Sequence, residues 1–401
     1  MSAVPEETVD SRPYPGSGSS GGAGGGVTAF VGTGAVTDVV VTLGAGHPST
    51  HGALRLALRL DGDRIVSADP QVGYLHRGAE KLFEVRDYRQ IGMLANRHDW
   101  LSSFGSELGV ALVVERMLGL HVPPRARWLR TLLAELTRVL HHLAFLGTYP
   151  LDVSARAARG EQAHRREQAR AVIQRRLEEA TGGRMHEMYV RVGGLHRDVP
   201  DGWPQAVAET VAEVRPEVHT LRELVETDPG VLRATRGVGI LNSRDAAAYG
   251  ASGPTARASG LDMDLRRDHP YDAYGELDVR VVTRQQGDSQ ARLSCLAEEC
   301  EVSLDLVERC LQSLPEGPVT TRLPKVLRIP EGHGYLATEN PAGMNGWFLV
   351  SRGEPTPHRL KLRTASFPHA ALLSVLLPGL RVADIPAVLA SLSIIVGDID
   401  R

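Results

Sequence analysis

The stretch PRARWLRTLLAELTRVLHHLAFLG, residues 124–147, decides the fold class of this chain. Its apolar residues recur every three or four positions, which is the spacing of one face of an α-helix. They form a broad stripe at Trp128, Leu129, Leu132, Leu133, Leu136, Leu140 and Leu143. A stripe of this width predicts a helix that is buried inside a bundle.

Further helices are predicted on both sides of this stretch, at about 99–118, 204–227 and 288–313. The segment 161–180 is strongly charged and predicts an exposed helix, with a partner-binding surface as the alternative. Short alternating runs between 38 and 75, with Asp-Gly-Asp between two of them, predict a small antiparallel sheet. Residues 360–376 predict a strand, a turn and a helix.

These patterns predict an α+β chain that is predominantly helical. We expect a disordered Gly/Ser-rich tail over 1–37 and a small β-rich domain over 38–90. A helical core is expected over 91–318, and a C-terminal α/β portion that returns to the functional site over 319–401.

Composition excludes several classes of protein. The formal net charge of the 401 residues is −3, which gives no electrostatic reason to expect nucleic acid or an anionic membrane as the main partner. No apolar run is long enough to span a bilayer, and the acidic N-terminus does not resemble a secretory signal. The three cysteines, Cys295, Cys300 and Cys310, form no CxxC pair, which favours a reducing compartment over a disulfide scaffold.

The segment GAGHPSTHGALRL, residues 44–56, places two histidines in a run of turn-forming residues. Pro48 and Gly52 favour a tight loop over a helix. Three roles are therefore open for His47 and His51: metal ligands, proton donors to a substrate, or polar loop residues.

Three other groups of polar residues are candidates for chemistry. Asp152 follows the long buried helix at its negative end, where a carboxylate needs a partner such as a histidine. Asp99 precedes a predicted helix and is either its N-cap or a catalytic group. The remaining candidates are His76, Arg77, Glu80 and Lys81 after a predicted strand, Arg97 and His98 beside Asp99, and His186, Tyr189 and Arg191 beside a glycine pair.

Six motifs in order give the chain a family resemblance: GHPSTHG, GYLHRGAEKL, LLAELTRVLHHLAFLGTYPLD, GGRMHEMYVRVGGLHRDVP, RASGLDMDLRRDHPYDAY and the terminal VGDIDR. In this order they resemble the D subunit of bacterial NADH–quinone oxidoreductase (respiratory complex I), which is related to the large subunit of nickel–iron hydrogenases. The resemblance runs from about residue 38 to the C-terminus. It implies a hydrogenase large-subunit-like fold.

A nickel–iron centre needs four cysteine thiolates, in one CxxC pair near the start of the chain and another at its end. The corresponding stretches here, ANRHDWLSSF and SLSIIVGDIDR, contain no cysteine, so hydrogenase activity is excluded. The three existing cysteines are expected on one helix, as small buried apolar residues.

In the family, the vacated metal cavity is the head-group end of a quinone channel beside an iron–sulfur cluster of a partner subunit. The resemblance implies that His51 lies beside the quinone head group and that Asp152 hydrogen-bonds to it. His47 would support His51. Arg97 and His186 would flank the cluster.

The chain departs from the family pattern at three places. Trp100 stands where the family has a tyrosine whose phenol donates to the quinone, and an indole N–H cannot release a proton. Ala291 and Leu296 stand where charged residues are expected, and the chain is shorter between Pro324 and Tyr335. A divergent paralogue is therefore expected, with Trp100 as a wall that stacks on a quinone ring.

The resemblance implies a peripheral subunit of a complex I-like NADH–quinone oxidoreductase, in which quinone reduction is coupled to proton translocation. Its partners would be the iron–sulfur (B-type), C-type, I-type and membrane quinone-channel (H-type) subunits, which attach it to the cytoplasmic side of the cell membrane. The chain itself would bind quinone as substrate but neither NAD nor a cofactor of its own, and it would act only within the assembly.

Two alternatives remain open. The first is a non-catalytic structural or assembly paralogue, which Trp100 and the shorter segment favour. The second is a zinc protein that uses His47, His51 and His76.

Overall fold

Four antiparallel strands form a sheet near the N-terminus, in the order β1 (Val27–Phe30), β2 (Val36–Leu43), β3 (Leu54–Asp61) and β4 (Arg64–Gln71). The computed structural model describes residues 27–30, 36–43, 52–154 and 159–401; the side chains of 27–30, 151–152 and 159–163 are not described. The predicted turn joins β3 to β4, where Gly62 takes the left-handed conformation (φ 60°) that a tight hairpin needs. β1 and the start of β2 fall within 1–37, and the rest of that range lies outside the described residues.

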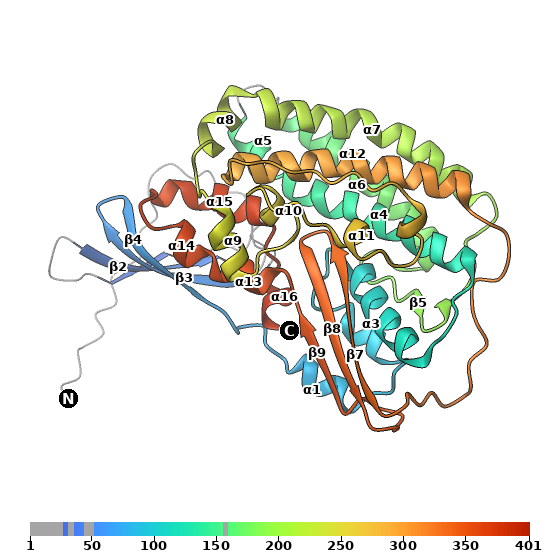
Figure 1. Ribbon diagram of the computed structural model, residues 1–401. Coiled ribbons are helices and arrows are strands. Elements are labelled where there is room, and N and C mark those ends of the chain that lie inside the picture. Colours follow the sequence, from blue (N-terminus) through green and yellow to red (C-terminus); the bar gives the residue numbers. More distant parts are fainter. Residues whose placement is uncertain (1–26, 31–35, 44–51, 155–158) are drawn as a thin grey trace, which may run out of the picture.

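The inner face of this sheet is apolar because β3 alternates apolar and polar residues. Leu54, Leu56 and Leu58 are buried and belong to one apolar cluster with residues of the C-terminal helices. The sheet lies at one end of the molecule (Figure 1), where β4 contacts α14 (Leu373–Leu376). The first and last parts of the chain therefore share a core.

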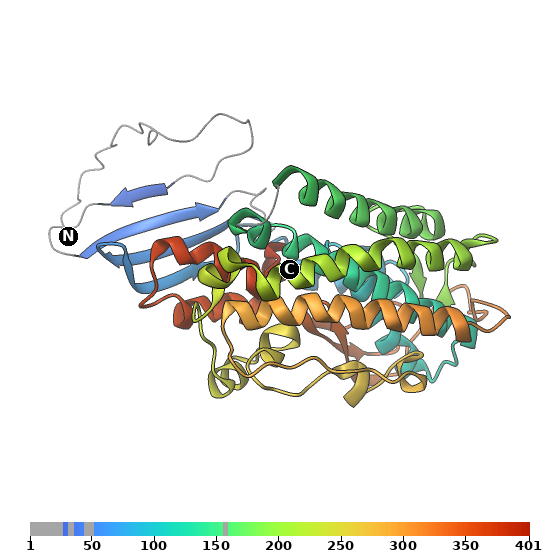
Figure 2. The ribbon, with the colours of Figure 1, turned by 90° about the horizontal axis from the view of Figure 1, so that it is seen from above.

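Long helices form the body of the molecule, as their periodicity predicts. They are α3 (Ser103–Leu118), α4 (Pro124–Leu146), α6 (Arg159–Thr181), α7 (Trp203–Thr227) and α12 (Ser289–Ser313). α12 packs against α4 and α7, and α6 packs against α4 and α7 (Figure 2). Six of the seven apolar residues of the α4 stripe are buried and Leu140 is half-buried, which confirms the predicted buried helix.

The cysteines fit the prediction made for them. All three lie on α12, are buried and form no disulfide. Burial raises the pKa of Cys295 to about 12, so this thiol stays protonated. They act as small apolar residues of the core.

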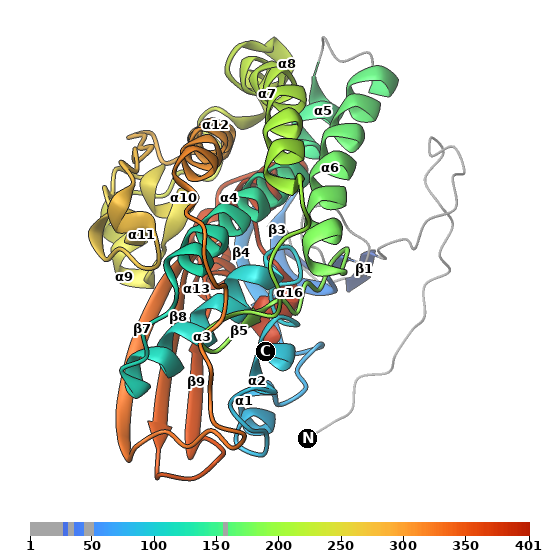
Figure 3. The same cartoon turned by 90° about the vertical axis from the view of Figure 1, so that its right-hand side faces the viewer.

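A second antiparallel sheet, β7 (Gly332–Asn340), β8 (Gly343–Ser351) and β9 (Arg359–Arg363), packs against α3 (Figure 3). After β9 the chain forms the predicted turn and helix, α13 (Ser366–Ala371), followed by α14, α15 (Ile385–Leu392) and α16 (Val396–Asp400). The shorter elements are α1 (Ala79–Phe83), α2 (Ile91–Ala95), α5 (Tyr149–Val153), β5 (Val190–Arg191), β6 (Gly194–Leu195), α8 (Pro229–Thr235), α9 (Ser243–Tyr249), α10 (Gly253–Arg257), α11 (Leu265–Asp268) and the 3₁₀ turns Tyr274–Glu276 and Val382–Asp384. The fold is thus α+β and predominantly helical, as predicted.

A buried ionic network joins the helical core to the second sheet. Arg257 of α10 donates to Glu299 of α12 (Nε to Oε1, 3.0 Å) and to Glu339 of β7 (Nη1 to Oε1, 2.7 Å). Arg266 of α11 donates to Glu135 of α4 (Nη1 to Oε2, 3.1 Å). These five side chains are at most 3% exposed, so each charge depends on its partners.

No helix in the described part of the chain combines the length and the apolar character needed to cross a membrane.

Candidate functional site

The C-terminal helix α16 is the point where the candidate segments meet. Gly52, the residue after His51, lies so close to Val396 that a Cβ on it would be 2.5 Å from the Val396 Cβ. The carboxylate of Asp400 accepts hydrogen bonds from the backbone N–H groups of Gly73 and Leu75, both at 2.7 Å. Residues on both sides of the β3–β4 hairpin therefore contact α16, near the C-terminus.

Trp100 packs against the same helix. A Cβ on Gly397 would overlap the Trp100 ring and the backbone carbonyl of His98, so only glycine lets the indole lie this close to the backbone. The Trp100 side chain is half-buried. The flat Trp100 ring thus lies against α16, next to the residue, Val396, that Gly52 contacts.

Three residues predicted for the quinone site cannot be compared with the structure. His47 and His51 lie outside the described residues, and so does the side chain of Asp152. The backbone of Asp152 belongs to the short helix α5, which packs against α15. α15 precedes α16 in the chain.

Arg97 and His186, 89 positions apart in the sequence, are brought together. Burial lowers the pKa of His186, and the positive charges of Arg97 and then Arg77 lower it further, while a hydrogen bond to the Asn96 backbone opposes them. Arg77 also donates to the carbonyl of Arg97 (Nη2 to O, 2.6 Å). The result is a surface where two guanidinium groups adjoin a neutral imidazole.

A buried glutamate explains why these two segments meet. Glu107 of α3 accepts from the Asn96 side chain at 2.8 Å and from the backbone N–H groups of Met188, Tyr189 and Val190 at 2.7, 2.9 and 3.1 Å. It therefore ties the residue before Arg97 to the loop that carries His186. Sequence patterns gave no reason to select Glu107, since it lies mid-helix among apolar residues.

Three ionisable side chains close to Trp100 or Gly397 in the chain, His98, Asp99 and Asp398, are buried. His98 Nε2 is 3.5 Å from Asp398 Oδ1 and 3.2 Å from the Ser106 hydroxyl. Burial lowers the pKa of His98 to about 3, helped by the charges of Arg77 and Arg401. His98 is therefore neutral at pH 7.

The two carboxyl groups of this cluster belong to Asp99 and Asp398. Asp99 accepts from the Ser102 backbone N–H at 3.1 Å within the turn before α3. The predicted N-cap role of Asp99 is wrong, because α3 begins at Ser103 and its N-cap is Ser102. Asp398 accepts from the Ser366 backbone N–H at 3.0 Å. In the sequence, VGDIDR serves only as a family motif, and Asp398 is not among the predicted site residues. The signal that could have indicated it is the pair of acidic residues directly after the apolar run SLSIIV.

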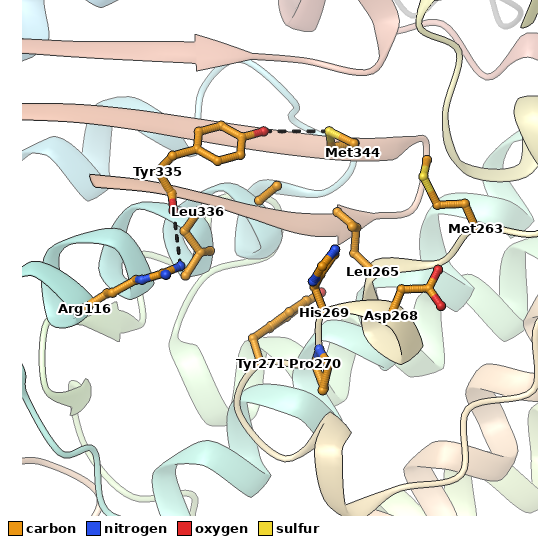
Figure 4. A pocket seen from close by; sticks show the side chains of 11 residues that line it. Arg116, Met263, Leu265, Asp268, His269, Pro270, Tyr271, Tyr335, Leu336 and Met344 are labelled. Atoms are coloured by element: carbon orange, nitrogen blue, oxygen red, sulfur yellow. Dashed lines mark hydrogen bonds between the residues drawn. The ribbon is translucent and has the colours of Figure 1, made fainter. Parts of the chain in front are cut away.

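A large cavity within the described part of the chain lies elsewhere. It has a volume of about 750 Å³ and is lined by residues of β7, β8 and the α11 segment, among them Tyr271, Tyr335 and Met344 (Figure 4). None of the predicted site residues lines it. Residues 44–51 are outside the described residues, so these statements do not extend to the space next to His51.

Metal binding finds no support in the described residues, which contain no cluster of three His, Cys, Asp or Glu side chains suited to a metal ion. The zinc alternative depends on His47 and His51, which are outside them. His76, its third ligand, has Nδ1 2.6 Å from the backbone carbonyl of Asp400.

Comparison with known proteins adds independent information. Residues 164–401 match the family model of the respiratory-chain NADH dehydrogenase 49 kDa subunit. The chain is 57% identical to an NADH-quinone oxidoreductase D subunit of Salinispora tropica over 92% of its own length and 96% of that protein. It is 57% identical to a D subunit of Streptomyces coelicolor, covering 91% and 96%, and 37% identical to one of Rhizobium meliloti, covering 91% and 96%. The chain therefore belongs to the family of NADH-quinone oxidoreductase D subunits, that of the 49 kDa subunit of respiratory-chain NADH dehydrogenase.

Proposed function

We propose that this chain is the D subunit of an NADH–quinone oxidoreductase and forms the head-group end of its quinone site. The observation that carries the proposal is that Gly52, the residue after His51, and Trp100 pack on adjacent residues of α16, Val396 and Gly397. The names of the relatives support the assembly and the substrate class. Quinone reduction within the assembly would be coupled to proton translocation.

The residues can be given separate roles in this reaction. A quinone takes up two electrons and two protons. His51 would donate one proton, a role to which an imidazole is suited, and Asp152 would hold its tautomer and charge. Trp100 would stack on the quinone ring, and its indole N–H can donate a hydrogen bond but no proton.

Electrons would come from an iron–sulfur cluster of the neighbouring B-type subunit. Arg97, Arg77 and His186 form the surface that would face this cluster. Positive charge and hydrogen-bond donors stabilise the reduced, more negative form of a cluster and raise its potential. This surface would therefore both position the cluster next to the quinone site and raise its reduction potential.

The chain would be held on the cytoplasmic side of the cell membrane by its partners, the B-, C-, I- and H-type subunits. It would carry no cofactor itself, and NADH would be oxidised elsewhere in the assembly. Activity is expected only of the assembled complex.

The test uses membranes in which this chain is the only D-type subunit. Trp100→Ala is expected to lower NADH–quinone reductase turnover at least roughly tenfold, because the ring loses its stacking wall. Trp100→Tyr is expected to raise turnover, because a phenol can release a proton. NADH–hexacyanoferrate(III) reductase activity, which does not need the quinone site, should stay constant and report assembly. Equal quinone turnover in all three proteins would contradict the proposal.

A second candidate function is that of a non-catalytic structural paralogue. It is favoured by the indole at position 100 and by the shorter segment between Pro324 and Tyr335. In that case the wild-type membranes would retain the complex but show no quinone reductase activity in the same assay.

A further inference from the structure

The indole at position 100 leaves one proton of quinone reduction without a donor. This question rests on the proposed function, in which His51 supplies only the other proton. Two carboxyl groups belong to the segments that pack together at this indole. Asp99 precedes Trp100 in the chain, and Asp398 follows Gly397, against which the Trp100 ring packs.

Both side chains are enclosed by protein. Asp99 is 2% exposed and Asp398 is 3% exposed. Burial raises the pKa of Asp99 well above its usual range, and the charge of Asp398 raises it further. Burial raises the pKa of Asp398 to about 6, although hydrogen bonds from Ser366 and the charges of Arg401 and Arg363 oppose it. Two buried carboxyl groups that repel each other in this way retain one proton between them near neutral pH.

Groups from every side stabilise the pair after that proton leaves. Ser366 of α13 donates to Asp398, and His98 Nε2 lies 3.5 Å from it. Asn340 of β7 and the Leu101 and Ser102 backbones donate to Asp99. The charged groups that act on the pair are Arg363 of β9 and Arg401 at the C-terminus, and these favour the ionised form.

A small internal hole is lined by Asn340, the side chain that hydrogen-bonds to Asp99, although neither acid lines it. Its volume is about 10 Å³, close to that of one water molecule, and its lining includes Ser102, Arg138, Tyr271 and Asn340. The Ser102 hydroxyl and Arg138 Nη1 are buried and have no hydrogen-bond partner among the described residues. Such orphan groups are typical ligands of an internal water.

The hole and the large cavity share one lining residue. Tyr271 lines both, and its hydroxyl accepts from the backbone N–H of Glu339 at 3.1 Å. Consecutive residues of β7 pass from one space to the other: Leu336 and Ala337 line the large cavity, and Thr338, Glu339 and Asn340 line the hole. Figure 4 shows Tyr271 and Leu336 on the wall of the large cavity.

We propose that Asp99 and Asp398 hold one shared proton for the head-group site beside Trp100. After this proton has been used, water that enters from the cavity at Tyr271 and reaches the hole at Asn340 supplies the next one. In the balanced step, two electrons reach the quinone from the partner's iron–sulfur cluster. One proton comes from His51 and one from the acid pair, and quinol is formed. Both carboxyl groups are then ionised until a proton from solvent water restores the pair.

The test compares Asp398→Asn and Asp99→Asn with Asp398→Glu in membranes that contain no other D-type subunit. Quinone reductase turnover is measured from pH 6 to 9. The asparagine variants are expected to lose at least roughly tenfold at pH 8 and less at pH 6, because protons must then come directly from solvent. Asp398→Glu, which keeps an ionisable group, should recover most of the turnover.

Two further variants complete the design. Asp288→Asn is the matched control, since Asp288 is a buried aspartate that caps α12 through the Ala291 N–H at 2.8 Å; it should keep the wild-type profile. Ser102→Ala removes a ligand of the internal water and should slow turnover roughly fivefold at pH 8. Hexacyanoferrate(III) reductase activity normalises every value to the amount of complex.

Each outcome decides a separate point. A loss of equal size at all pH values in the asparagine variants would assign the pair a structural role and overturn the inference. Wild-type turnover in Ser102→Ala would overturn the route through the hole. If Trp100→Ala abolishes turnover while both asparagine variants match the wild type, the quinone site stands and only the acid pair is refuted.

Discussion

Replacing Arg257 by leucine is expected to lower the free energy of unfolding of the chain by about 3–5 kcal/mol. The substitution leaves Glu299 and Glu339 without their shared cation, in a region where Arg257 itself is 0% exposed. A buried carboxylate without a partner must either bear its desolvation cost or take up a proton. Urea unfolding of the purified chain measures the loss.

Arg267 provides the matched control in the adjoining segment. It pairs with Asp262 at 2.8 Å and Asp268 at 2.7 Å, but its side chain is 39% exposed. Solvent screens these pairs, so Arg267→Leu should cost less than about 1 kcal/mol. A similar loss of unfolding free energy in both variants would contradict the view that burial makes the Arg257 ion pairs more important for stability than exposed ones.

Replacing Asp398 by asparagine is expected to stabilise the chain at pH 7.5, on the order of 2 kcal/mol, while it impairs quinone reduction. The pKa of Asp398 is about 6 in the folded chain, against an ordinary value of 3.8. The folded state therefore holds more protons than the unfolded state between these values, and wild-type stability falls as pH rises through this window. Asparagine avoids that cost and can still accept the hydrogen bond from Ser366.

The sign of this effect makes it testable by urea unfolding at two pH values. The advantage of Asp398→Asn should be small near pH 4 and complete above pH 6. An Asp398→Asn chain that is less stable than the wild type by the same amount at pH 4 and pH 7.5 would contradict the raised pKa. A stabilising substitution that removes activity is the behaviour expected of a functional group held under strain.

The main elements of the fold were predictable because their signals are local. The α4 stripe, the Asp-Gly-Asp hairpin and the strand, turn and helix after residue 359 each follow from spacing over about a dozen residues. The charges buried on α4, such as Glu135 and Arg138, were not foreseen. They are stable only because Arg266, Glu339 and other residues far along the chain reach them.

The site was predictable only in part, for the same reason. Arg97 and His186 were selected from two separate groups of polar residues, and the family resemblance gave them a common role. Glu107 brings them together by hydrogen bonds that no sequence pattern indicates. The contact of Trp100 with Gly397 and the effect of the Asp398 charge on the pKa of Asp99 involve residues about 300 positions apart. Such contacts arise from the return of the C-terminus to the first sheet, which depends on the whole fold. His47, His51 and Asp152 remain predictions.

The proposed reaction requires a quinone head group that lies against Trp100 beside α16. Photolabelling tests this directly: a short-chain quinone with a photoreactive ring substituent is illuminated in membranes that contain the assembled complex, and the labelled peptides are identified by mass spectrometry. The label should appear in the peptide containing Trp100 or in the one containing Val396–Asp400, and excess unmodified quinone should suppress it. Suppressible labelling confined to the cavity at Tyr335 and Met344, or absent from this chain, would contradict the proposed site.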